Sequence, residues 1–225
     1  MKKVDGTMFS VEMMDRVIRS GIIAVLELER IEDAVPVTDA LLAGGVSAIE
    51  LTLRTPAALG SIGAIARNRP EMTIGVGTVL FVEQVKQIID AGAHFAVAPG
   101  FNPLIVDEAK RLGIPFSPGI VTPSELEGAL SKGCRLLKFF PAEPSGGVEY
   151  LKSMNNPYAY LGLSYIPLGG VNLANLPQYA AMKEVVAIGG TWISQRKLIN
   201  EHAWDEITSR AKEAKRVWHE VRNSL

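Results

Sequence analysis

The sequence has few of the residues on which disulfide, metal and nucleic-acid chemistry depend. It contains one cysteine, Cys134, in 225 residues, so no intrachain disulfide can form and we expect a reducing compartment. The 23 lysines and arginines are balanced by 24 aspartates and glutamates, which argues against nucleic acid or an anionic membrane as the main partner. No apolar run approaches the roughly 18 residues of a membrane-spanning helix. Residues 1–17 hold two lysines but no continuous apolar core, so we expect no export signal and a cytoplasmic protein.

Histidine is also scarce, and its distribution excludes several reaction types. His94, His202 and His219 are scattered along the chain, and no cluster of histidines and carboxylates has metal-ligand spacing, so we expect no metal centre. We find no Ser-His-Asp set and no nucleophile elbow. No GxGxxG motif follows the first apolar run, so no dinucleotide cofactor is expected. Carbonyl chemistry would then have to come from a lysine.

What the sequence does contain is a regular alternation of short apolar runs with longer amphipathic segments. With 48% hydrophobic and 21% charged residues, the chain can bury a sizeable core. Eight runs, each followed by a turn and a helical stretch, predict an α/β fold, a (β/α)8 TIM barrel forming a single domain over residues 1–225. The runs lie at residues 22–27, 47–53, 73–79, 94–98, 115–120, 135–140, 164–168 and 185–190.

Capping residues mark the expected starts of several helices. Thr55, Asn102 and Thr122 each precede a proline, so we expect each side chain to cap a helix whose first residue is that proline. Glu125 would complete a capping box with Thr122. Apolar stripes predict two further helices, an extra one before the first run and one at the end of the chain, at residues 9–18 and 202–223.

A lysine interrupts one of the apolar runs. Lys138 lies within RLLKFF, and the alternation of side chains along a strand places it on an enclosed face whichever way the strand is turned. Burying an ammonium is costly, and desolvation favours the free amine that attacks a carbonyl to form a Schiff base. A buried ion pair, or a lysine reaching out from the end of a strand, explains the residue equally well.

A carboxylate interrupts a second run in the same way. Glu50, Thr52 and Arg54 share one face of the segment AIELTLRT. In a functional interpretation, Glu50 performs acid/base catalysis and Arg54 binds a substrate carboxylate. Because Glu50 and Lys138 are both enclosed in the predicted barrel, we expect them to attract each other, which would keep Glu50 ionised. The alternative is an internal pair between Glu50 and Arg54 that has no catalytic role.

Glycine pairs occur at the ends of the last two predicted strands. Gly169 and Gly170 follow the seventh run, and Gly189 and Gly190 end the eighth. At this place in βα barrels, backbone N–H groups commonly hold a phosphate. Thr191 adds a hydroxyl there. A tight turn explains each glycine pair equally well.

Several longer motifs follow one another in a fixed order between about Ile22 and Trp192. They are AGGVSAIELTLRT, IGVGTVL, FAVAPG, PGIVTPSEL, LLKFFPAE, PLGGVN and AIGGTW. In order and spacing they resemble the 2-keto-3-deoxy-6-phosphogluconate (KDPG) / 4-hydroxy-2-oxoglutarate (KHG) aldolase family. The resemblance implies a homotrimer of (β/α)8 barrels and a class I, metal-free aldolase of the Entner–Doudoroff pathway. Such an enzyme acts on a small 2-keto sugar-acid phosphate and uses a covalent Schiff base in place of a cofactor.

The resemblance also implies roles for individual residues. Lys138 resembles the Schiff-base lysine and Glu50 the general acid/base. The pocket for the pyruvate end of the substrate would be formed by Arg54, Thr78, Pro99 and Phe140. The phosphate end would be held by Gly169, Gly170 and Thr191, together with the backbone of Gly190.

Two positions depart from the family's usual pattern. Leu168 stands in PLGG where many phosphogluconate-type relatives have threonine, and relatives that act on the galactonate epimer have an apolar residue there. Glu27 stands where relatives often have an arginine. The expected function is therefore KDPG aldolase, with three alternatives: a KHG aldolase, a 2-keto-3-deoxy-6-phosphogalactonate aldolase and a non-catalytic barrel that binds sugar phosphates.

Overall fold

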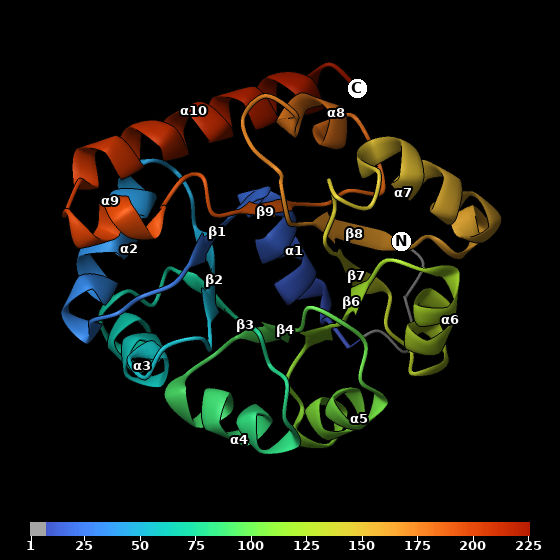
Figure 1. Ribbon diagram of the computed structural model, residues 1–225, viewed down its shortest axis with the longest axis horizontal. Coiled ribbons are helices and arrows are strands. Elements are labelled where there is room, and N and C mark those ends of the chain that lie inside the picture. Colours follow the sequence, from blue (N-terminus) through green and yellow to red (C-terminus); the bar gives the residue numbers. More distant parts are fainter. Residues whose placement is uncertain (1–7) are drawn as a thin grey trace.

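The computed structural model describes residues 8–225, whose strands form a closed parallel barrel (Figure 1). A six-stranded sheet has the order β5-β4-β3-β2-β1-β9, and a three-stranded sheet has the order β6-β7-β8. β5 and β6 are two halves of one strand that is interrupted at Pro118. A bridge between Tyr165 and Val185 joins β8 to the segment that leads into β9. The predicted (β/α)8 barrel is confirmed. The expectation that residues 1–17 hold no export signal falls in part on residues 1–7, which lie outside the described part of the chain.

Each strand lies within one of the predicted apolar runs. Parallel strands of a barrel are covered on both faces, so they are nearly continuously apolar in sequence instead of alternating. The strands are β1 (Ile22–Leu26), β2 (Ala48–Thr52), β3 (Thr73–Gly77), β4 (Phe95–Val97), β5 (Phe116–Ser117), β6 (Gly119–Ile120), β7 (Leu136–Phe139), β8 (Ser164–Pro167) and β9 (Ile188–Gly190).

Helices surround the ring of strands (Figure 1), and their apolar faces pack against the outward-facing strand residues in one large core. Within the described residues, no helix is long and apolar enough to span a membrane. The helices are α2 (Ala34–Ala43), α3 (Ala58–Asn68), α4 (Val82–Ala91), α5 (Pro103–Leu112), α6 (Pro123–Ser131), α7 (Gly147–Asn155), α8 (Leu176–Ala180), α9 (Arg196–Asn200) and α10 (Trp204–Asn223), with the 3-10 turns η1 (Ile31–Asp33) and η2 (Asn156–Leu161).

The predicted extra helix, α1 (Val11–Ser20), lies across one end of the barrel (Figure 1). Phe9 and Val17 pack with inward-facing strand residues, including Phe95 and Leu136, in a second and smaller core. The rings of Phe9 and Phe95 lie 6.0 Å apart. Because Phe95 and Leu136 are the first residues of their strands, this core fills the amino-terminal part of the barrel. Glu50 and Lys138 lie farther along their own strands, β2 and β7.

Two of the three predicted proline-linked caps are confirmed. The Asn102 side chain accepts a hydrogen bond from the first turn of α5. Thr122 and Glu125 form the reciprocal capping box at the start of α6. Each cap fixes the direction in which the chain leaves the carboxyl end of a strand.

Two predicted helix boundaries are wrong. Thr55 does not cap a helix, because α3 begins at Ala58 and the Thr55 hydroxyl donates instead to the carbonyl of Leu28 in the neighbouring strand-to-helix loop. The last helix begins at Trp204 and not at residue 202. His202 lies in the preceding turn with a φ of 54°. At Thr55 a contact between segments distant in sequence replaces the local pattern.

Candidate active site

A buried ion pair lies inside the barrel. Lys138 of β7 and Glu50 of β2 point toward each other, with Lys138 Nζ 2.8 Å from Glu50 Oε1. The two residues are only 5% and 3% exposed. The predicted attraction is confirmed, and Glu50 pairs with Lys138 in place of the alternative partner, Arg54.

The backbone of neighbouring strands leaves room for this pair. Gly77 of β3 faces Glu50, and a Cβ at that position would lie 2.1 Å from Glu50 Oε1. Gly119 of β6 is in register with Lys138. On the other side, the Phe140 ring lies 5.3 Å from Lys138 Nζ. The ion pair is therefore enclosed by backbone and by one aromatic face, which restricts both side chains to this geometry.

The pair lines a pocket of about 220 Å³ at the mouth of the barrel. Val25 and Val171 also line it, and sequence reasoning did not nominate them because apolar residues at strand ends look like any other core position. Gly189, a member of the second predicted glycine pair, lines it as well. The predicted site residues in the lining are Lys138, Glu50, Arg54, Phe140, Leu168, Gly169, Gly170, Gly190 and Thr191.

Two further predicted residues lie outside this lining. Thr78 is linked to it through Arg54, whose Nε donates to Thr78 Oγ1 at 3.3 Å. The backbone φ of Thr78 is 62°, which is unusual for a β-branched residue. Such values are typical of functional sites, where surrounding contacts hold a strained backbone. Pro99 is not a lining residue; its carbonyl group lies against Gly119, beside the strand that carries Lys138.

The turn after β8 has a backbone shape that favours glycine. Gly169 and Gly170 have φ values of 90° and 86°, and a Cβ on Gly170 would lie 2.6 Å from Glu143 Cβ. The N–H of Glu143 donates to the carbonyl of Gly169 at 2.9 Å, and its carboxylate accepts from the Tyr179 hydroxyl. Burial and this carboxylate raise the pKa of Tyr179, so its hydroxyl stays a donor. The glycine turn is thereby braced at the mouth of the barrel, on the side where Thr191 also lines the pocket.

Arg54 belongs to a chain of ion pairs at the rim of the pocket. Arg54 Nη1 lies 3.5 Å from Glu27 Oε2, and Glu27 Oε1 accepts from Arg196 Nη1 at 3.0 Å. Sequence reasoning singled out Glu27 but missed Arg196. Arg196 begins the short helix α9, 169 residues further along the chain, so no local pattern could reveal the contact.

Two further observations concern possible metal ligands and the lone cysteine. Among residues 8–225, no group of three or more His, Cys, Asp or Glu side chains could hold a metal ion. Cys134 is buried, and desolvation raises the pKa of its thiol to about 11. Since the thiolate is the reactive form, Cys134 is a packing residue at neutral pH.

Known proteins with similar sequences and structures include aldolases. The family model for KDPG and KHG aldolase matches residues 13–210. The chain belongs to this family. The 2-dehydro-3-deoxy-phosphogluconate aldolase of Haemophilus influenzae is 40% identical, over 87% of this chain and 92% of its own. The KHG/KDPG aldolase of Escherichia coli K12 is also 40% identical, over 86% and 90%.

A solved member of the KDPG and KHG aldolase family has the same fold and carries a reaction intermediate. The KDPG aldolase of Legionella pneumophila, with pyruvate captured at low pH as a covalent carbinolamine, superposes with a TM-score of 0.85. It is 33% identical, and the alignment covers 89% of this chain and 97% of that one. The fold and the family predicted from the sequence are both confirmed.

We expect Gly77→Ala to destabilise the protein by about 1–3 kcal/mol, the usual range for overpacking a core. The added methyl group must displace the Glu50 carboxylate from Lys138. Urea unfolding measures the effect of Gly77→Ala on the free energy of unfolding, both in the wild type and in a Glu50→Ala background. In the Glu50→Ala background, where the carboxylate is absent, Gly77→Ala should cost little stability. Gly100→Ala is the matched control, because nothing lies within 4 Å of a Cβ there. Equal losses with and without Glu50 would show that Gly77 does not position this carboxylate.

Proposed function

We propose that this protein is a class I aldolase that cleaves KDPG to pyruvate and glyceraldehyde 3-phosphate through a Schiff base on Lys138. The proposal rests above all on one observation, an enclosed lysine amine that lies 2.8 Å from a carboxylate and lines a pocket with it. Family membership supports the reaction. The carbinolamine in the Legionella relative supports a covalent pyruvate intermediate.

In this mechanism Glu50 first serves as the base for Lys138. The proton of the ion pair moves from Lys138 Nζ to the Glu50 carboxylate, and the free amine attacks the C2 ketone of the substrate. The carbinolamine oxygen is then protonated and leaves as water, which gives an iminium. The short distance between the two groups allows the proton to move without a carrier.

Cleavage of the carbon–carbon bond uses the same carboxylate. Glu50, directly or through a water molecule, takes the proton from the C4 hydroxyl while the C3–C4 bond breaks and its electron pair moves into the iminium. The products are glyceraldehyde 3-phosphate and an enamine on Lys138. Glu50 returns the proton to C3, and water hydrolyses the resulting iminium to pyruvate and the free lysine.

The ends of the substrate occupy opposite sides of the pocket in this proposal. The Arg54 guanidinium holds the carboxylate, because its planar fork matches two oxygens, and Thr78 supports it. Pro99 supports the pocket from behind Gly119. Backbone groups of the two glycine turns, with the Thr191 hydroxyl and the Phe140 ring, enclose the remainder, and the phosphate lies at Gly169, Gly170 and Gly190.

We also propose that residues 1–225 form a single domain that assembles as a homotrimer in the cytoplasm and acts in the Entner–Doudoroff pathway. Exposed apolar side chains near the starts of α4 and α5 support contact between copies, because such groups gather at protein interfaces. They are Leu80, Phe81, Val82 and Leu104. Light scattering of the purified protein tests the assembly.

Incubation with pyruvate and borohydride tests the reaction class directly. We expect one reduced pyruvate adduct per chain, located at Lys138 by peptide mass mapping, because this amine is enclosed beside a base. Lys132, which is partly buried, and Lys152, which is exposed, form surface ion pairs and serve as internal references that should stay unmodified. An adduct at another lysine, or none, would contradict the proposal, and the sugar-phosphate-binding barrel would then be favoured.

We expect Glu50→Gln to lower kcat by about 10²–10⁴-fold, the usual effect of losing a positioned acid/base group. The amide can still accept a hydrogen bond from Lys138, so the pyruvate adduct should remain trappable on long incubation. Steady-state release of pyruvate from KDPG provides the measurement. Glu149→Gln, which changes an exposed surface pair, is the control. Turnover within a few-fold of the wild type in a folded Glu50→Gln protein would make this carboxylate structural.

Substrate preference depends on Leu168, which is 5% exposed and packs over Gly189. An apolar wall discriminates by only about 10–200-fold, whereas a hydroxyl that reads a substrate group can discriminate far more. We therefore expect kcat/KM to differ little between the gluconate and galactonate epimers, and Leu168→Thr to favour the gluconate form. Both phosphorylated substrates should exceed KHG, because binding energy from the phosphate is kept in the transition state. Strict discrimination by the wild type would mean that another residue reads C4.

A further inference from the structure

Four charged side chains form one network at the rim of the pocket: Glu27, Glu29, Arg54 and Arg196. We call them the rim network. Arg196 spans both acids, with Nη1 3.0 Å from Glu27 Oε1 and Nη2 paired with Glu29. Glu27 in turn contacts Arg54 at 3.5 Å. The network thus connects helix α9 to the guanidinium that the proposed function assigns to the substrate carboxylate.

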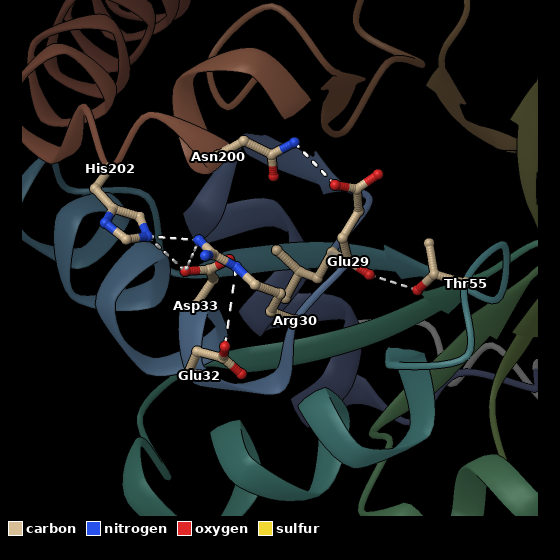
Figure 2. A network of polar contacts seen from close by, with 8 residues as sticks. Glu29, Arg30, Glu32, Asp33, Thr55, Asn200 and His202 are labelled. Carbon is tan, nitrogen blue, oxygen red and sulfur yellow. Dashed lines mark hydrogen bonds and ion pairs between the residues drawn. The ribbon is translucent and has the colours of Figure 1, made fainter.

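The loop that carries the two acids is fixed from both sides. Asn200 of α9 donates a hydrogen bond to the Glu29 carboxylate at 3.0 Å (Figure 2). The Thr55 hydroxyl donates to the backbone carbonyl of Leu28, in the segment after β1. Further along the same loop, Arg30 and Asp33 pair at 2.9 Å, and His202 contacts Asp33 at 3.1 Å (Figure 2). The loop is therefore held between the segment that precedes α3 and the α9–α10 turn, which limits how far Glu27 can move.

The position of Glu27 creates an electrostatic conflict with an anionic substrate. Strand β1 lies between β2 and β9 in the sheet, so Glu27 stands between the Arg54 loop and the segment that follows Thr191. A substrate carboxylate on Arg54 would share that guanidinium with Glu27, and two anions on one cation repel each other. The side chain of Glu27 is 28% exposed, so water screens this repulsion only in part.

Arg196 resolves this conflict by charge balance. With Arg196 in place, the two acids and two arginines of the rim network sum to zero charge. Without it, an uncompensated carboxylate would face the substrate and would compete with it for Arg54. An arginine suits this place because its planar fork donates to two carboxylates at once, which a lysine ammonium does less well.

We propose that Arg196 is a positioning residue for substrate binding: by neutralising Glu27 and Glu29, it leaves Arg54 available to the carboxylate of pyruvate. This inference rests on the proposed function, which places that carboxylate on Arg54. It assigns Arg196 no contact with the substrate. Its effect belongs to the binding of the keto acid and not to the chemical steps at Lys138.

The test measures the pyruvate concentration that half-saturates borohydride trapping at Lys138. For Arg196→Gln we expect this concentration to rise about tenfold, with the maximal extent of trapping and the urea midpoint unchanged, because half-exposed ion pairs contribute little to stability. Hydroxyacetone, a carbonyl probe without a carboxylate, should be trapped equally by both proteins. The tenfold effect should shrink at high salt, which screens charges at the rim.

Three further variants test whether Arg196 acts by neutralising Glu27 or in another way. In a Glu27→Gln background, Arg196→Gln should change pyruvate binding by less than twofold, because the repelling charge is gone. Arg196→Lys should recover most of the lost binding. Lys197→Gln is the matched control, since Lys197 is the next residue of α9 and its side chain is 80% exposed; it should behave like the wild type.

The outcomes are distinct. A wild-type protein that traps no pyruvate at Lys138 overturns the proposed function and this inference with it. If the wild type traps pyruvate but Arg196→Gln stays within twofold of it, the inference alone is wrong. The inference is likewise overturned if the loss persists without Glu27, because Arg196 then acts directly, or if hydroxyacetone trapping falls equally, because its role is then structural.

Discussion

The buried pair of Lys138 and Glu50 is the interaction around which the interior of the barrel is arranged. Removing two charges from water is costly, and their attraction offsets that cost only when the geometry is good. The closed ring of strands supplies this geometry, because β2 and β7 direct the two side chains to one point inside it, 2.8 Å apart. Loss of either partner would leave an uncompensated buried charge. The chemistry proposed for this lysine and the stability of the interior therefore depend on the same contact.

The barrel divides its interior into an apolar part and a polar part. Helix α1 and the first residues of several strands form the apolar core at one end, and the pocket that the ion pair lines lies at the mouth. The mouth is built from loops, which carry side chains such as Arg54 and Thr191 on a rigid scaffold. One end of each strand thus contributes to stability, while the other end positions the groups that the proposed function uses.

How much the sequence predicts depends on whether the cause of a feature is local. A lysine in an apolar strand is visible because burying a charge is costly, and the eight runs are visible because both faces of a parallel strand are covered. The break at Pro118 follows from the missing N–H of proline, although the runs alone do not reveal it. Thr55 and Arg196 were misjudged or missed, because their partners, Leu28 and Glu27, are distant in sequence. Such contacts exist only after the barrel has closed.

The charge balance of the pocket limits how it can bind an anion. Among the described residues of the pocket and its rim, Lys138 is matched by Glu50, and Arg54 and Arg196 are matched by the two acids of the rim network. With these cations paired, the phosphate in the proposed function is held mainly by backbone N–H groups and a hydroxyl. Oriented dipoles of this kind bind an anion only at short range and in a fixed orientation. In the proposed function, the shape of the glycine turn after β8, with φ values near 90°, therefore determines where the phosphate of a bound keto acid lies.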